Sequence, residues 1–527
     1  MKRFLIFCCL FIFFTNYIFA QNSTIFLENY YKNEFLRFSK NACPSSFYPS
    51  NEGVFKLSDS IKDKRVFYYD LPVWFFQKHW IQVEKEQFSI HISPLIHFAY
   101  GKSTDTVDIK PLFRNSRGIY LDGQLGSKFS FQFVISENQS SFCDYEAQYF
   151  KDRGELYVTP NGYTKVNAVI PSASRTKYFK DTIYPNAFDY AFSVGAVAYQ
   201  INNKSRVEFG NTQQFIGNGY RSLFLSDNST HAPFFRFQRS FCKRWCYNFL
   251  SKKTLNLIRK PFSNGIEKSY ENKWFLAHYL TFQVKENLNI SFFTGGIHLR
   301  ADSIQKHSIN PLFILPTFNT DLWNHSSIVN GINGLNIDYF LSGIKCYAQI
   351  VMDQVNKKTL FASQLGIHYF NVLKIKRLDF QIEWNQIPED FYSNSNFKLA
   401  YSHSNLSITH PKGNNFSELY FRLSFMYKRF QFLCSFSNYF TRGGDIYSQI
   451  IQNNLFLTSD KKKMLFSQNG QTQIYIGEII YRWNNRYNAQ LYFQFRSRIS
   501  NFGIFHQQNN SYLAGVRMSL FNQYLDF

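Results

Sequence analysis

The residues best suited to chemistry lie in one long polar segment, Phe209 to Phe237, between two aromatic, strand-like runs. Connections of this length without helical or strand periodicity are usually functional or disordered, and this one carries few of the Lys, Glu and Pro residues that mark disorder. Its donors and acceptors are Asn211, Gln213, Asn218, Tyr220, Arg221, Asp227 and Asn228. They could form a recognition surface for a hydrogen-bonding ligand, or they could satisfy only one another and the backbone.

Other parts of the chain offer little chemistry. The stretch Gly217 to Gly219 lacks the Lys-Ser/Thr pair of a phosphate-binding loop. No GxSxG nucleophile elbow occurs, so we expect no enzyme activity. His403 and His410 have no neighbouring carboxylate before Glu418, and we expect them to hold their loop together rather than to bind a metal. The sequence therefore predicts no metal and no cofactor.

The N-terminus has the features of an export signal. Lys2 and Arg3 precede an apolar run from Phe4 to Phe14, and Ala20 is a suitable cleavage residue, so we expect residues 1–20 to be a signal peptide. The apolar run is shorter than the roughly 20 residues that a membrane-spanning helix needs. Cleavage would lower the formal net charge from +22 to +20. Export argues against nucleic acid as a partner, and the scattered basic residues favour acidic polysaccharide or lipid phosphate.

Residues 21–87 are expected to form a small periplasmic segment or plug. Ile25 to Phe38 carries a rough helical stripe, and Asp70 with Pro72 can begin a second short helix. The cysteines that follow the signal peptide match no disulfide framework or zinc site, although Cys242 and Cys246 could face each other across a tight turn.

From about residue 88 the apolar residues alternate with polar ones. Aromatic residues make up 20% of the chain, yet the mean hydropathy is −0.30, as half-buried strands require. Leu419 to Tyr427 and Phe430 to Phe436 form a clear hairpin around Lys428-Arg429. The runs are about ten residues long, which suits a tilted strand across a bilayer. Residues 88–527 should thus form an all-β barrel of about 18 antiparallel strands, starting near residues 88, 116, 127, 190, 204, 233, 244, 274, 287, 335, 343, 359, 374, 416, 429, 471, 485 and 510.

The connections alternate between tight turns and long loops. The tight ones lie at 126–127, 202–204, 242–243, 285–286, 342–343, 428–429 and 484–485, and the long ones at 137–189, 210–232, 252–273, 298–334, 387–415 and 441–470. This asymmetry is typical of barrels in the Gram-negative outer membrane. With a periplasmic N-terminus, the long loops reach the cell surface, and the polar segment is one of them. The last strand should run through Leu520, with Phe527 acting as an aromatic insertion signal.

A barrel of this size encloses a wide lumen unless something fills it. Glu137 to Asp189 is long enough to fold inward, so we expect a plugged barrel. Four inward arginines, Arg422, Arg496, Arg498 and Arg517, either line the lumen and select anions or pair with Glu418, Asp379 and Glu383.

Four segments carry a family resemblance. GNTQQFIGNGYRSLFLSDNSTHAPFFR resembles the stretch around GDGYRSLLLSDN in gliding-motility outer-membrane proteins of the RemB type, which are similar to Wzi-like capsule-assembly barrels. The other segments are SPLIHFAYGK (Ser93 to Lys102), NSRGIYLDGQLGSKFSFQF (Asn115 to Phe133) and YSHSNLSITHPKGNNF (Tyr401 to Phe416). The chain departs from this family by the short loop Asp353 to Lys358 and by Lys461 to Lys463.

The resemblance implies a non-enzymatic surface protein that supports gliding motility or the assembly and attachment of capsular polysaccharide. Its partners would be outer-membrane lipid and either surface polysaccharide or the motility and secretion machinery. An outer-membrane porin for small solutes is the alternative function.

Overall fold

The computed structural model describes residues 32–33, 46–48, 79–104, 109–159, 162–173, 175–179, 184–242, 244–259, 270–300, 307–308, 313–315, 328–355, 358–394, 396–442, 469–485, 487–503, 505–518 and 522–527. None of the helices in these ranges has the length and apolarity to cross a membrane. The expected signal peptide, residues 1–20, lies outside the described residues. So does most of the expected helical element, of which only Lys32 and Asn33 are described, and that element is not confirmed.

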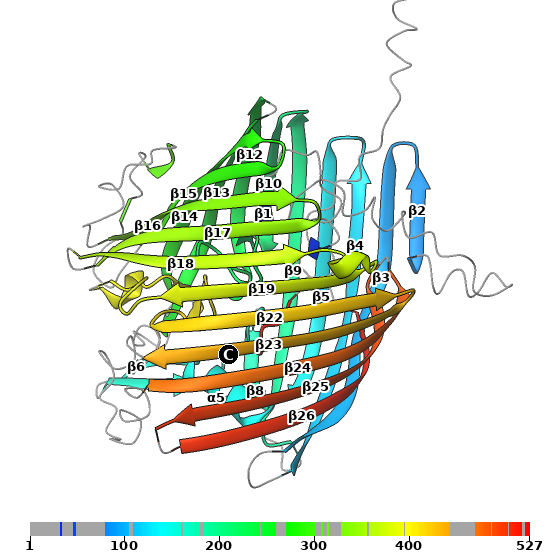
Figure 1. Cartoon of the computed structure of the whole chain (residues 1–527), viewed down its shortest axis with the longest axis vertical. Coiled ribbons are helices and arrows are strands. Elements are labelled where there is room, and N and C mark those ends of the chain that lie inside the picture. Colours follow the sequence, from blue (N-terminus) through cyan, green and yellow to red (C-terminus); the bar gives the residue numbers. More distant parts are fainter. Residues whose placement is uncertain are drawn as a thin grey trace, which may run out of the picture.

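Eighteen antiparallel strands form a closed barrel (Figure 1). They are β3 (Phe88–Thr104), β4 (Ile109–Leu125), β5 (Phe129–Ser141), β9 (Ala187–Asn202), β10 (Ser205–Thr212), β12 (Ala232–Cys242), β13 (Trp245–Arg259), β14 (Tyr270–Lys285), β15 (Leu288–Leu299), β16 (Val329–Leu341), β17 (Ile344–Val355), β18 (Lys358–Tyr369), β19 (Leu378–Ile387), β22 (Phe416–Tyr427), β23 (Phe430–Arg442), β24 (Asn469–Asn484), β25 (Ala489–Phe502) and β26 (Phe505–Met518). The barrel closes where β26 pairs with β3, from Asn510 opposite Thr104 to Arg517 opposite His97. The predicted all-β barrel of 18 strands is confirmed.

Side-chain alternation explains why these strands form a barrel. On β17, Ile350 points outward and is 48% exposed, whereas Gln349 next to it points inward and is wholly buried. The same holds around the wall, where outward positions carry exposed Phe, Tyr, Ile and Leu and inward positions carry buried polar groups. An apolar outer face with a polar interior is the pattern of a membrane barrel. Cys242 and Cys246 are not opposite each other in the β12–β13 ladder, where Cys242 pairs with Trp245 and Cys246 with Ser240. Cys242 is exposed, Cys246 is buried, and both are free thiols.

The predicted strand starts and tight turns agree with the structure, with a few differences. β4 begins at Ile109 instead of near residue 116, because it pairs with β3 along its whole length. Short connections also occur at the long-loop end, between β17 and β18 and between β25 and β26. An extra strand, β2 (Ile81–Lys85), pairs with residues 88–92 at the start of β3. β26 pairs with the same edge of β3 at residues 97–104.

We had expected the polar segment to reach the cell surface. In the structure it turns into the lumen of the barrel instead. Residues 213–231, which we call the plug segment, are almost entirely buried and contain β11 (Phe215–Ile216). β11 pairs with β1 (Phe47–Tyr48), so the chain before the barrel also enters the lumen. The expected plugged barrel is therefore observed.

Three further segments pack inside the wall. The first is α5 (Asp144–Asp152), which lies in the region expected to fold inward and buries Phe150 and Glu146. The rest of that region extends the wall instead: β8 (Arg175–Phe179) pairs with β9, β6 (Glu155–Thr159) pairs with the end of β13, and β7 (Gly162–Val166) pairs with β6. The inner loop, residues 396–415, contains η3 (Phe397–Leu399), β20 (Ser402–His403) and β21 (Leu406–Ser407). It is bonded to the plug segment, for example from Ser226 N to Ile408 O at 2.8 Å. A second short helix, η2 (Val372–Lys374), lies in the turn between β18 and β19.

The C-terminal segment, residues 522–527, is the third inner piece. The last strand ends at Met518, before the expected Leu520, and Tyr524 to Phe527 are buried. Figure 1 marks the C-terminus within the outline of the barrel. The ring of Phe527 stacks on Tyr149 of α5 at a centroid distance of 3.7 Å. Phe527 is therefore not the aromatic end of an outer strand, because the chain turns inward before reaching it.

Candidate functional site

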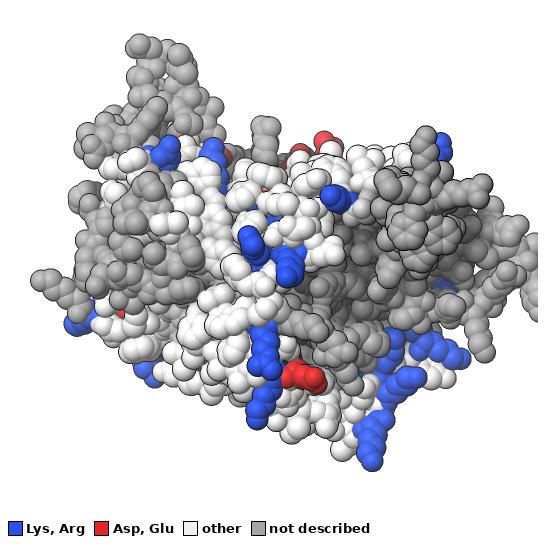
Figure 2. Space-filling view, turned by 90° about the horizontal axis from the view of Figure 1, so that it is seen from above, with Lys and Arg blue, Asp and Glu red and all other residues white. Residues whose placement is uncertain are grey.

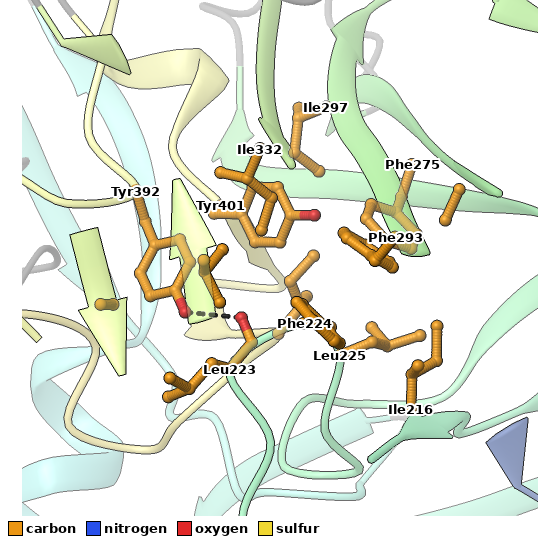
Figure 3. Packing of buried hydrophobic residues seen from close by; sticks show 14 of the residues in the cluster. Ile216, Leu223, Phe224, Leu225, Phe275, Phe293, Ile297, Ile332, Tyr392 and Tyr401 are labelled. Carbon is orange, nitrogen blue, oxygen red and sulfur yellow. Dashed lines mark hydrogen bonds between the residues drawn. The ribbon is translucent and has the colours of Figure 1, made fainter. Parts of the chain in front are cut away.

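Apolar packing holds the centre of the plug segment. Leu223, Phe224 and Leu225 are wholly buried against wall residues of β14, β15 and β16, as Figure 3 shows. The ring of Phe224 stacks on that of Phe293 at 4.5 Å between centroids and 12° between planes. The hydroxyl of Tyr392 donates a hydrogen bond of 2.6 Å to the carbonyl of Leu223. These contacts fix the path of the segment through the lumen.

Inward polar side chains of the wall bind the backbone of the plug segment. Gln349 of β17 accepts from the Leu223 amide at 3.0 Å, and Glu383 of β19 accepts from the Tyr220 amide at 2.7 Å. The two glycines of the segment permit this approach. A Cβ on Gly217, which has φ of 149°, would lie 2.6 Å from Gln349 Nε2, and a Cβ on Gly219 would collide with the Glu383 carboxylate.

Arg221 joins the plug segment to the C-terminal segment. Its Nη2 lies 2.7 Å from Asp526 Oδ1, and both side chains are buried. Its guanidinium also lies 4.6 Å from the ring of Tyr220 and 4.3 Å from that of Tyr524. Burial and the Asp526 carboxylate raise the pKa of Tyr220 well above its ordinary value, so its hydroxyl donates to Asp526 Oδ2 at 3.1 Å. Arg221 is thus a structural cation in this arrangement.

The remaining predicted residues also have partners within the protein. Asp227 accepts from Tyr524 Oη at 2.7 Å and from Asn522 Nδ2 at 2.8 Å, which anchors the C-terminal segment. Gln213 donates to the Asp227 and Ser229 carbonyls, and Asn228 to the Ser407 carbonyl.

Asn218 binds Asp338 and accepts from Lys345 at the other end of the segment. Asn211 is the exception to the inward arrangement. It lies on β10 and donates to the Ser193 carbonyl of β9 at 2.9 Å. The structure therefore brings six of the seven residues into the lumen, where they form hydrogen bonds and ion pairs within the protein, as one of the two alternatives predicted. Ligand binding by these residues stays a prediction.

The two loop histidines hold the inner loop, as expected. His403 Nδ1 accepts from the Leu255 amide at 3.2 Å, and its Nε2 lies 3.2 Å from the His231 carbonyl. Burial lowers the pKa of His403 to about 3, so the ring is neutral. His410 Nε2 lies 2.7 Å from Glu418 Oε2, the carboxylate that follows it in sequence.

Beside the plug lies a polar cavity of about 220 Å³ at the seam of the barrel. It is lined by Leu95, His97, Arg114, Ser116, Val134, Ser136, Asn138, Ser172, Tyr190, Phe192, Glu478, Tyr492, Gln494, Arg496, Leu513, Arg517, Met518, Asn522, Gln523 and Leu525. The C-terminal segment forms one side of the cavity with Asn522, Gln523 and Leu525. Asp227 of the plug segment accepts a hydrogen bond from Asn522 and holds it in place. The plug segment therefore shapes this cavity without filling it.

The lining carries more positive than negative charge. Arg517 Nη2 pairs with Glu478 Oε2 at 3.1 Å, and Arg496 pairs with Glu146 of α5. Among the described residues Arg114 forms no ion pair; it donates to the Ser141 carbonyl and lies 4.1 Å from the Phe142 ring centroid. In the described part of the chain the three arginines therefore face two carboxylates, those of Glu478 and Glu146, which leaves one positive charge without a negative partner. Such a surplus in a sheltered cavity attracts anionic groups.

Sequence reasoning found part of this cavity. Arg496 and Arg517 were expected in the lumen, but their partners are Glu146 and Glu478 instead of the three carboxylates anticipated. Arg114 was missed because β4 was expected to begin after it. Alternation along Leu112, Arg114 and Ser116, all buried, was the signal that could have placed it inward.

Comparison with known proteins supports the fold. No protein-family model and no curated protein sequence matches the chain. Among solved structures, it is similar to Wzi of Escherichia coli, an outer-membrane protein involved in group 1 capsule assembly and a carbohydrate-binding β-barrel, with a TM-score of 0.50 and 11% identity over 94% of this chain and 99% of that one. It also matches two proteins of Pseudomonas aeruginosa. These are OccK7 (TM-score 0.43, 8% identity, 81% and 97% coverage) and the outer-membrane protein OprD (0.41, 10%, 82% and 94%).

At these identities the likeness establishes the fold alone. The chain has a Wzi-like barrel of the outer-membrane type, and the sequence resemblance to gliding-motility proteins gains no support from these matches.

Proposed function

We propose that this protein is a non-enzymatic surface barrel of the Gram-negative outer membrane that binds acidic polysaccharide and helps to attach or assemble it at the cell surface. The observation that carries the proposal is the cationic cavity beside the plug. Arg114 presents a guanidinium that no carboxylate neutralises among the described residues, and carboxylates and phosphates are the groups that a guanidinium binds best.

The size of the cavity suits one acidic sugar better than a length of polymer. Its volume of about 220 Å³ lies below the roughly 300–1,000 Å³ of sites for drug-sized ligands. Asn138, Gln494 and Asn522 in the lining add amide groups that can bind sugar hydroxyls. Lys and Arg side chains also lie scattered over the face seen from above in Figure 2, with few acidic ones among them, and such a charge balance attracts anionic groups.

The plug favours binding over diffusion. An open channel needs a hydrated path, yet the plug segment is packed against the wall by wholly buried apolar side chains. The fold is also similar to that of a barrel known to bind carbohydrate. We therefore place the porin function second.

A deletion strain complemented with point variants tests the proposal. We expect loss of the chain to reduce retention of acidic surface polysaccharide and to leave uptake of small solutes unchanged. Arg114→Gln should fail to restore retention at normal surface levels. Arg117→Gln removes the same charge from an exposed position of the same strand and should restore it fully.

The strain also separates the alternatives. Loss of surface movement with normal polysaccharide retention would point to gliding motility, and loss of solute uptake alone would point to a porin. Full restoration by Arg114→Gln would contradict the proposed role of the cavity.

A further inference from the structure

A cluster of metal-ligating side chains lies at the short-turn end of the barrel, apart from the cavity. His79, His91 and Asp122 are all buried, and each offers one ligand atom such that these atoms lie within 4.8 Å of one another. His91 Nδ1 is 3.0 Å from Asp122 Oδ2, and the rings of His79 and His91 stack at 4.7 Å between centroids. We propose that these three residues bind a divalent transition-metal ion such as zinc.

The strand register explains how the cluster forms. His91 of β3 and Asp122 of β4 are direct partners across the ladder, and both point inward. His79 lies immediately before β2, whose Ile81 pairs with Ile92 of β3. The ligands therefore come from two adjacent wall strands and from the chain that enters the barrel. A bound ion would fasten that entering chain to the wall.

Two observations distinguish the cluster from an ordinary hydrogen-bonded pair. Asp122 is more than nine-tenths buried, yet its Oδ1 has no hydrogen-bond partner among the described residues. A buried carboxylate oxygen without a partner is costly, and a cation would satisfy it. In addition, His79 Nδ1 lies 2.9 Å from Ser93 Oγ, the kind of contact that orients a metal-bound imidazole.

The ligand set suits zinc in particular. Imidazole nitrogen and carboxylate oxygen bind Zn²⁺ at about 2.0–2.2 Å, which places tetrahedral ligand atoms roughly 3.4 Å apart. The three atoms must therefore draw together slightly, and the stacked rings must tilt toward the ion. Glu84 of β2 lies 3.4 Å from His91 Nε2, the ring nitrogen that does not contact Asp122, and can orient the imidazole from there. Metal binding releases the proton of the hydrogen bond between His91 Nδ1 and Asp122 Oδ2, because both atoms bind the ion in deprotonated form.

Zinc retention by the purified full chain tests the site. The protein, carrying a tag without histidine, is loaded with Zn²⁺ in detergent, dialysed against metal-free buffer and analysed by mass spectrometry of the elements. We expect about one zinc per wild-type chain, and at least about tenfold weaker binding in Asp122→Asn and His91→Gln. Ser93→Ala should weaken binding about 10- to 100-fold while leaving all three ligands in place.

His368→Gln is the matched control, since it removes another buried inward histidine from a different part of the wall. It should retain zinc as the wild type does. Heat-modifiable migration on gels shows that each variant is folded. A folded wild type that retains no zinc, or an Asp122→Asn variant that retains as much as the wild type, would overturn the proposal.

Discussion

Replacing Arg221 with alanine should release the plug segment while leaving the barrel wall intact. Arg221 is wholly buried, and its pairing with Asp526 at 2.7 Å links the plug segment to the C-terminal segment. The ladder of the wall does not depend on either residue, because neither belongs to a barrel strand. The variant should therefore insert and migrate as a folded barrel.

The size of the effect follows from the buried carboxylate that remains. Removing one partner of a buried ion pair costs about 3–5 kcal/mol, because the other charge stays out of water without compensation. Asp526 would keep the Tyr220 hydroxyl at 3.1 Å, which is a weaker partner than a guanidinium. Since about 1.4 kcal/mol corresponds to a factor of ten, the released state should become roughly 150- to 5,000-fold more populated.

Hydrogen exchange measures this release directly. In Arg221→Ala, amides of residues 213–231 and 522–527 should exchange faster than in the wild type, whereas those of the strands should not change. The double variant Arg221→Met with Asp526→Leu removes both charges and should recover much of the protection. Unchanged exchange of residues 213–231 in Arg221→Ala would refute the reasoning, and so would a double variant as fast as the single one.

Two further substitutions test how the plug segment is held. Phe224→Ala should destabilise its packing by about 3–5 kcal/mol and speed its hydrogen exchange, because the ring is wholly buried; Phe361→Ala, at an outward position 61% exposed, should not. Gly219→Ala should raise ion conductance in planar bilayers, because its Cβ would collide with Glu383 and lie 2.8 Å from the Arg221 carbonyl. Gly477→Ala, whose Cβ meets no heavy atom within 4 Å, should conduct like the wild type.

The wall of the barrel was predictable because its signal is local. Period-two alternation depends on neighbouring residues of one strand, so the runs around Leu419 to Tyr427 and Phe430 to Phe436 gave β22, β23 and their turn almost to the residue. The start of β4 was missed because polar Arg114, Asn115 and Ser116 interrupt the apolar pattern that marks a strand.

The path of the polar segment was not predictable in the same way. Whether a loop leaves the barrel or enters it depends on wall residues far away in sequence, such as Gln349 and Glu383, which bind the backbone of the plug segment. The sequence placed these polar residues together in one segment but did not indicate the side of the wall on which they lie. The same reason hid the cluster of His79, His91 and Asp122, which only the pairing of β2, β3 and β4 brings together.

Titration of the purified protein with short oligosaccharides in a calorimeter tests the central claim most directly. The account predicts saturable binding of a uronic-acid oligosaccharide and none of a neutral one of equal length. Arg114→Gln should weaken that binding at least about tenfold, because a charge-assisted hydrogen bond contributes about 1.5–3 kcal/mol. Arg117→Gln should bind as the wild type does. Equal affinity for acidic and neutral sugars, or an unchanged affinity in Arg114→Gln, would contradict the account.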